Sequence, residues 1–133
     1  MNDSNNLNKD KFIEMLVSFS GISKEELLQK GVFETGDLSE SFEEIDRRSV
    51  SRILHNFMRI VLGIKDEPDI SKAYILKDLF DCRVCANHIA QVYLKGVMKE
   101  VNIDGLIIFD VYGKVTENDV EVWLEAVREL KDM

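Results

Sequence analysis

The stretch Ile45-Asp46-Arg47-Arg48-Ser49-Val50-Ser51-Arg52-Ile53-Leu54-His55-Asn56-Phe57 contains the pattern that decides the fold. Asp46 is a helix-capping residue type. The residues 4, 7, 8 and 11 positions after it are all apolar, which places them on one face of a helix with 3.6 residues per turn. Ile45, before the cap, stands where a hydrophobic staple fixes the entry of the chain. The stretch therefore predicts an amphipathic helix that begins after Asp46.

The same pattern occurs at two other places in the chain. Asn8 and Thr116 are also capping residues, and an apolar residue precedes each of them, Leu7 and Val115. The apolar positions are Phe12, Met15, Leu16 and Phe19 after Asn8, and Val120, Trp123, Leu124 and Val127 after Thr116. Coincidence of cap, staple and apolar spacing at three sites indicates an internal repeat.

A second repeated element precedes two of these helices. Leu28-Gln29-Lys30-Gly31-Val32-Phe33 matches Tyr93-Leu94-Lys95-Gly96-Val97-Met98 at an offset of 65 residues. Glycine after an apolar periodic run is typical of a helix end, because glycine accepts the left-handed conformation that closes it. The same interpretation applies to Gly21 and Gly63. The repeating unit is a helix, a Lys-Gly stop, a loop, a cap and a second helix, in full at 24–63 and 70–132 and in part at 7–21.

The remaining periodicity predicts shorter helices at 24–30, 70–80 and 84–95. The strand-like run 106–109 is short and no other run matches it, so we predict an all-α fold. Pro68, within 65–69, marks the expected internal joint. We expect one domain over 1–133, because a chain of this length normally folds as one compact unit. The predicted architecture is a bundle of helix-loop-helix repeats.

Charge and composition exclude several classes of protein. The chain has 17 Lys and Arg against 25 Asp and Glu, giving a net charge of −8, which argues against a nucleic-acid-binding surface. No run approaches the ~18 apolar residues of a membrane helix, so we expect no membrane span. The polar residues 1–8 lack the basic and apolar regions of a secretory signal. We expect a cytoplasmic protein if Met1 is the native start, or else a piece of a longer, exported protein.

The repeating unit resembles the S-layer homology (SLH) domain, a bacterial cell-wall-attachment module. The second full copy follows the order of the family closely: Phe80-Asp81-Cys82 at the entry, Ala86 to Met98 as first helix and stop, Gly105 and Phe109 in the loop, and Val115-Thr116-Glu117-Asn118-Asp119 at the Ile-Thr-Arg-Ala-Glu motif. The other copies place Phe42 in the loop, Ile45-Asp46-Arg47-Arg48-Ser49 at the motif, and Leu7-Asn8-Lys9-Asp10-Lys11 at the third motif position. The resemblance covers nearly the whole chain, from Leu7 to Leu130.

What the resemblance implies is a pseudo-threefold bundle that binds an acidic secondary cell-wall polysaccharide in grooves between repeats. In the family the motif arginine hydrogen-bonds an acidic sugar group, and the stop glycine lets the sugar approach the backbone. Arg47 alone keeps the motif arginine, whereas Lys9 keeps only its charge and Glu117 reverses it. The ligand-binding residues expected on this basis are Arg47, Lys9, Gly31, Gly96 and Thr116.

We therefore expect a non-catalytic, carbohydrate-binding module that anchors a protein at the bacterial cell surface. The alternative is an SLH-fold interaction or spacer domain that has lost polysaccharide binding, in which case the partner is another protein chain and the location is intracellular. No nucleophile elbow, phosphate loop or HExxH motif is present, so no catalytic residue and no cofactor is expected.

Two patterns invite a metal interpretation. Cys82-x-x-Cys85-x-x-His88 could begin a zinc site, with His55 as the other histidine, but a structural zinc commonly needs a second ligand pair. We expect small core cysteines rather than a zinc, redox or disulfide site. The segment 100–107 imitates a calcium-binding loop, but Val111 stands where the loop needs a bidentate carboxylate. A turn with acidic neighbours is expected there, and no metal.

Arg48, Arg52 and Arg59 lie at helical spacing off the apolar stripe of the second helix of the first full unit. Such a row favours a solvated helix face, since long charged side chains cover the polar side of amphipathic helices. The alternative is an anion-recognising groove that includes Arg47.

Overall fold

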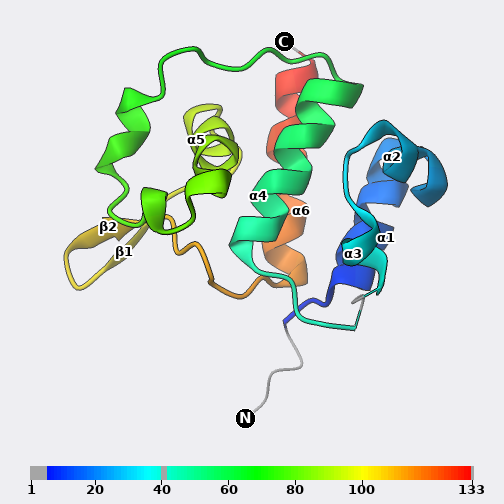
Figure 1. The fold of residues 1–133 in the computed structure, drawn as a ribbon, viewed down its shortest axis with the longest axis horizontal. Helices are drawn as coiled ribbons and strands as arrows, with labels where there is room; N and C mark the ends of the chain where they lie inside the picture. The colour runs from blue at the N-terminus through cyan, green and yellow to red at the C-terminus, as the bar shows by residue number, and fades with distance from the viewer. Residues whose placement is uncertain (1–5, 40–41, 133) are drawn as a thin grey trace.

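The computed structural model describes residues 6–39 and 42–132, and these residues are mostly helical (Figure 1). The helices are α1 (Lys9–Ser20), α2 (Lys24–Lys30), α3 (Thr35–Ser39), α4 (Arg47–Asn56), α5 (Ala86–Leu94) and α6 (Glu117–Lys131). A π-helical segment, Phe57–Val61, continues α4, and 3-10 turns lie at Ser71–Ile75, Leu79–Asp81 and Arg83–Cys85. Strands β1 (Val101–Ile103) and β2 (Leu106–Ile108) form an antiparallel hairpin. The prediction of a mainly helical chain is confirmed.

The three predicted caps each begin a long helix. The Asn8 side chain accepts a hydrogen bond from the amide of Lys11 at 2.8 Å, and Asp46 accepts one from Ser49 at 2.8 Å. Thr116 forms a reciprocal capping box with Asp119. The predicted stripes face the core, because their residues are buried except Met15 and Phe19, which are partly buried. Local sequence therefore determined where these helices begin and which face they bury.

The chain segments that enter α1, α4 and α6 meet at one end of the molecule. The amide of Leu7 donates to the carbonyl of Val115 at 2.8 Å, and the amide of Ile45 donates to the carbonyl of Leu7 at 2.9 Å. A third hydrogen bond joins the segments that enter α4 and α6: the amide of Arg47 donates to the carbonyl of Gly113 at 2.9 Å. The three entries are thus joined in all three pairwise combinations, and their staple residues Leu7, Ile45 and Val115 are buried.

The two Lys-Gly stops have the same backbone geometry. Gly31 and Gly96 have φ angles of 88° and 76°, which favour glycine. The amide of Val32 donates to the carbonyl of Leu27 at 3.1 Å, and 65 residues later Val97 donates to Val92 at 2.9 Å. The apolar residues that follow, Val32, Phe33, Val97 and Met98, are all buried. The repeated sequence therefore encodes a repeated helix end of the Schellman type.

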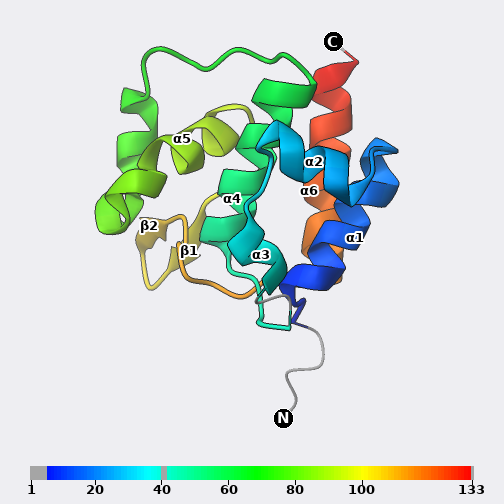
Figure 2. The same cartoon turned by 45° about the vertical axis from the view of Figure 1, so that its right-hand side comes forward.

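In space, α4 lies between two groups of elements (Figures 1 and 2). On one side are α1, α2 and α3, and on the other α5 lies with the β1–β2 hairpin at one of its ends. Helix α5 packs on α4, and α1 packs on α6. The irregular segment 62–70, which contains Pro68, arches from the end of α4 to the first 3-10 turn.

Two predictions about secondary structure were wrong. Residues 70–80 form two 3-10 turns rather than one helix, because the amide of Lys77 donates to the carbonyl of Ile107 and the Asp78 carboxylate binds the loop after β2. The run 106–109 does have a partner, since Leu106–Ile108 pairs with Val101–Ile103. Asp104 and Gly105, both with positive φ, make the turn between these strands.

Helix α3 was not predicted, because its five residues are too few to show a period. None of the helices in the described parts of the chain has the length and apolar character needed to cross a membrane.

Candidate functional site

A groove of about 720 Å³ lies between α6 and the segment that follows Gly96. It is lined by Arg47 from the start of α4, by Gly96 and Lys99, and by Trp123 and Val122 of α6. We call it the Arg47 groove. Two of the five residues predicted to bind a ligand, Arg47 and Gly96, therefore meet in one place although 49 residues separate them.

Arg47 is held in a fixed orientation beside this groove. Its Nε donates to the carbonyl of Phe109 at 2.7 Å, and Nη2 donates to the carbonyl of Lys99 at 2.8 Å. The guanidinium carbon lies 4.7 Å from the centroid of the Phe109 ring and 5.3 Å from that of Trp123, within the range of cation–π attraction. Arg47 thereby joins α4 to the loop and to α6 at once.

Burial lowers the pKa of the Arg47 guanidinium, and the carboxylates of Asp110, Asp119 and Asp78 act in the opposite direction. Arg47 nevertheless remains charged at neutral pH, because a guanidinium is not deprotonated in proteins. The residue is only 9% exposed, so a cation lies almost buried between two aromatic rings.

Asp78 and Gly113 support Arg47, and sequence reasoning missed both. The Asp78 carboxylate accepts hydrogen bonds from the amides of Phe109, Asp110 and Val111 at 2.7, 2.8 and 3.0 Å. A Cβ at Gly113 would clash with the Asp110 carboxylate and would come within 3.1 Å of the Arg47 Cδ atom. Asp78 thus fixes the loop that Arg47 binds, and Gly113 leaves room for both.

The other three predicted site residues lie elsewhere. The Lys9 ammonium is 3.7 Å from the Glu43 carboxylate. Gly31 follows α2, and a Cβ there would be 4.0 Å from Ile60. Thr116 caps α6 with its side chain, so its hydroxyl is engaged within the backbone. Glu117, the residue at the Arg47 position of this motif, is exposed.

The charge of the Arg47 groove is negative on the α6 side. Two cations, Arg47 and Lys99, line it, whereas the acidic lining residues are Glu100, Asp119, Glu121, Glu125 and Glu129. The two cationic residues are neighbours at the backbone of Lys99, whose carbonyl accepts a hydrogen bond from the Arg47 guanidinium. The groove therefore offers a small basic end and a longer row of carboxylate acceptors.

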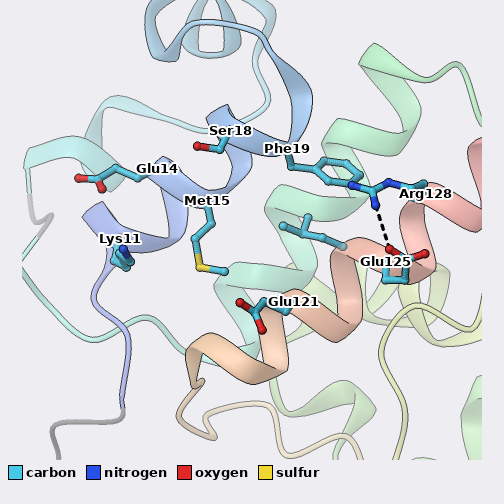
Figure 3. A pocket seen from close by; sticks show the side chains of 9 residues that line it. Lys11, Glu14, Met15, Ser18, Phe19, Glu121, Glu125 and Arg128 are labelled. Atoms are coloured by element: carbon cyan, nitrogen blue, oxygen red, sulfur yellow. Dashed lines mark hydrogen bonds and ion pairs between the residues drawn. The ribbon is translucent and has the colours of Figure 1, made fainter.

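A second groove, of about 430 Å³, runs between α1 and α6 (Figure 3). Arg128 lies over the Phe19 ring and is 3.0 Å from the Glu125 carboxylate, which closes one end. Glu121 and Glu125 line both this groove and the Arg47 groove. One acidic face of α6 therefore separates the two.

Cys82 and Cys85 form a disulfide, contrary to the expectation of unlinked core cysteines. His88 does not join them in a metal site, because its Nδ1 lies 2.8 Å from Nδ1 of His55. The calcium-like residues fall in the β1–β2 hairpin, where the side chain of Asn102 accepts a hydrogen bond from the Gly105 amide. In the described part of the chain, no three Cys, His, Asp or Glu side chains converge as metal ligands would.

The predicted solvated row of arginines is only partly exposed. Arg59 is exposed, but Arg52 binds the buried Asp37 through both guanidinium Nη atoms, at 3.2 and 2.8 Å. Burial by itself would raise the pKa of Asp37, but the hydrogen bonds from Arg52 and the Glu34 amide outweigh it and lower that pKa. Arg48 lies over the Tyr112 ring.

Compared with models of protein families, with curated proteins and with solved structures, the chain gives no match.

Proposed function

We propose that this chain is a non-catalytic, SLH-like module whose Arg47 groove binds a cell-wall polysaccharide and so holds a bacterial surface protein in place. The observation that carries the proposal is the meeting of Arg47, Gly96 and Trp123 in one groove. These residues come from the motif of one predicted unit and from the stop and second helix of the next. A groove between units is where the SLH resemblance leads us to expect the ligand.

The chemistry of the groove suits a saccharide. Two of the five N–H donors of Arg47 bind carbonyls in the described part of the chain, which leaves donors for a sugar carboxylate or hydroxyl. Gly96 presents no side chain, and space is open above it. Trp123 contributes apolar surface to the groove wall, and the carboxylates of α6 are acceptors for sugar hydroxyl groups. Orientation of a ligand would thus come from a few fixed polar groups, as in most small-molecule sites.

The negative side of the groove restricts where an acidic sugar group can lie. Carboxylates of like sign repel an anion, so we place the acidic group at Arg47 and Lys99 and the neutral hydroxyls along α6. A uniformly acidic polymer would bind less well than one in which charged and neutral sugars alternate.

The experiment is co-sedimentation with purified bacterial sacculi. Arg47 is buried, so its removal would disturb the fold as well as the ligand; Lys99→Glu is the better variant because the Lys99 side chain is exposed. The matched control is Lys72→Glu, on the exposed 3-10 turn Ser71–Ile75. We expect sedimentation of the unmodified chain and of Lys72→Glu, with an about tenfold weaker affinity for Lys99→Glu, roughly the loss of one charge-assisted contact. Sedimentation no greater than that of serum albumin would contradict the proposal.

A second function, protein interaction, is favoured by the acidic face of α6. Glu121 and Glu125 line both grooves, and Val122 between them is 58% exposed. An apolar residue within a carboxylate row suits a partner helix with basic and apolar residues. A Lys- and Leu-rich amphipathic peptide that binds this chain, and loses binding to Val122→Asp but not to Val84→Asp, would support this function. Val84 is 88% exposed and lies outside both grooves.

A further inference from the structure

The Cys82–Cys85 disulfide opens onto a pocket of about 430 Å³ at the beginning of α5. Both cysteines line this pocket together with His88, Ser49, Arg48 and Arg52. The cysteines are 9% and 8% exposed, so the sulfur atoms are sheltered by the fold. Because both cysteines line the pocket, a small thiol that enters it can approach the disulfide.

His88 is the first member of a chain of hydrogen bonds that leads away from the pocket. Its Nδ1 is 2.8 Å from Nδ1 of His55, and Nε2 of His55 is 2.6 Å from Oδ1 of Asp66. His55 is 3% exposed, whereas Asp66 lies at the surface. Cys85 ends the 3-10 turn that leads into α5, and His88 follows it by three residues in the first turn of α5.

The direction of these bonds follows from the carboxylate. Asp66 can only accept, so Nε2 of His55 carries a hydrogen and donates it. With both rings neutral, Nδ1 of His55 then accepts from Nδ1 of His88, and the lone pair of His88 is left on Nε2. No hydrogen bond within the described chain occupies that nitrogen. His88, whose ring carries this unprotonated nitrogen, lines the same pocket as the disulfide.

Both cationic and anionic side chains surround the pocket. Arg48 and Arg52 line it together with Glu34, and the two arginines are paired with Asp46 and Asp37, whereas Arg59 acts on His88 from further along the α4 stretch. Burial, followed by the positive surroundings of His55, Arg52 and Arg59, lowers the pKa of His88 to about 4. His88 is thus neutral at physiological pH and binds an added proton only weakly, so it passes the proton on rather than keeping it. The added proton passes through the hydrogen bond from His88 to His55, and the resulting positive charge on His55 is balanced by the Asp66 carboxylate.

We propose that Cys82 and Cys85 form a redox-active pair that exchanges disulfide bonds with thiols, and that the chain His88–His55–Asp66 carries the proton of the incoming thiol. His88 is the group that contacts the thiol. His55 and Asp66 are positioning residues that act through it. This activity is separate from the Arg47 groove, since none of these five residues lines that groove.

The exchange balances in two steps. A thiol loses its proton to Nε2 of His88, its sulfur attacks Sγ of Cys82, the Cys82–Cys85 bond breaks, and Cys85 leaves as a thiolate. The thiolate is stabilised by Arg48, Arg52 and the start of α5, and it takes up the stored proton. A second thiol then attacks the mixed disulfide, which frees the Cys82 thiol. The sum is two thiols oxidised to one disulfide and one protein disulfide reduced to two thiols.

The test is the rate at which glutathione reduces the folded chain, followed by trapping of free thiols with iodoacetamide and mass spectrometry. We expect complete reduction at millimolar glutathione without denaturant. His88→Gln should slow the reaction about tenfold or more at pH 7, as loss of a general base does, and should move its rise to higher pH. Asp66→Asn should act in the same direction, and its exposed position keeps the fold intact.

Asp69→Asn is the matched control, because Asp69 is an exposed acid three residues from Asp66 whose carboxylate accepts a hydrogen bond from the Ser71 amide of its own turn. Its rate and pH profile should equal those of the unmodified chain. Circular dichroism of each variant checks that the helices remain. Reduction that occurs only after unfolding in urea would overturn the proposal. Equal rates and pH profiles for the unmodified chain, His88→Gln and Asp66→Asn would also overturn it, because the pair would then be a structural crosslink.

Discussion

The loops 31–46, described at 31–39 and 42–46, and 96–116 begin with the same helix end and finish at the same type of cap. Among the described residues, Arg47 is enclosed by the second loop. Phe109 in the second loop is fully buried beneath Arg47, whereas Phe42 in the first loop is 78% exposed. At the position of Arg47, the preceding entry has Lys9, which reaches Glu43 at 3.7 Å. The two loops therefore share their ends, and their described residues differ in the contacts that hold them.

In each loop one carboxylate accepts hydrogen bonds from backbone amides, but the number of amides that it binds differs between the loops. Asp78 binds three successive amides of the second loop, which holds the carbonyl of Phe109 where Arg47 can bind it. In the first loop the Asp37 carboxylate accepts a hydrogen bond from one amide, that of Glu34, and also binds the Arg52 guanidinium. The planar Arg47 guanidinium, with carbonyls and rings around it, forms part of a groove wall, whereas Lys9 offers a single ammonium group that lies 3.7 Å from the Glu43 carboxylate.

The largest effect is expected from Asp78→Ala, which removes the acceptor of three amides at once. Hydrogen bonds to a charged group are worth about 1.5–3 kcal/mol each and are not additive, so we expect a loss of about 3–4 kcal/mol. Urea unfolding followed by circular dichroism measures it. A loss below ~1 kcal/mol would show that the second loop does not depend on Asp78.

Arg47→Met should cost about 2–3 kcal/mol, because two carbonyls lose a charged donor and two rings lose a cation, while methionine keeps the packing. Lys9 corresponds to Arg47 in the repeat and contacts Glu43 of the first loop. Lys9→Met should lower the free energy of unfolding by less than about 1 kcal/mol, as the loss of a partly exposed ion pair does. The same urea titration compares the two. Equal losses would remove the distinction between the loops.

Gly31→Ala and Gly96→Ala should have the same effect, about 1 kcal/mol, because both glycines have positive φ and neither is crowded. Thermal unfolding of both variants tests whether the helix ends are equivalent. If the two losses of unfolding free energy differ by more than ~1 kcal/mol, the repeated sequence does not form two equivalent helix ends.

Lowering the pH is expected to have the smallest effect on the free energy of unfolding. The pKa of Asp37 is lowered in the folded chain by Arg52 and the Glu34 amide. Its contribution to stability is therefore present above the unfolded value of about 3.9 and is lost as the pH falls through the lower folded value. Unfolding free energies from pH 5 to 2 should fall less steeply for Asp37→Asn. An unchanged slope would contradict the account of the first loop.

Local patterns predicted what depends on near neighbours. The caps at Asn8, Asp46 and Thr116, the stripes behind them and the ends at Gly31 and Gly96 all form as the sequence indicates. Such features need only 3.6-residue spacing and a residue type, so one stretch of chain is enough to specify them.

Long-range contacts were beyond the same reasoning. Asp78 looks like any acidic residue of a helical run, yet it binds a loop more than 30 residues away. The pairing of β1 with β2 was missed because three-residue strands carry almost no alternation. Of the candidate site, Arg47 and Gly96 were found through the resemblance. Trp123 was assigned only to an apolar stripe, and the hydrogen bond between His55 and His88 left no sequence signal.

Trp123 is the single tryptophan of the chain and lines the Arg47 groove, so its fluorescence tests the central claim most directly. Soluble cell-wall polysaccharide is titrated into the unmodified chain, Lys99→Glu and Lys72→Glu. We predict a saturable change of Trp123 emission that is about tenfold weaker in apparent affinity for Lys99→Glu and unchanged for Lys72→Glu. No change of emission, or one that both variants alter equally, would contradict binding in the Arg47 groove.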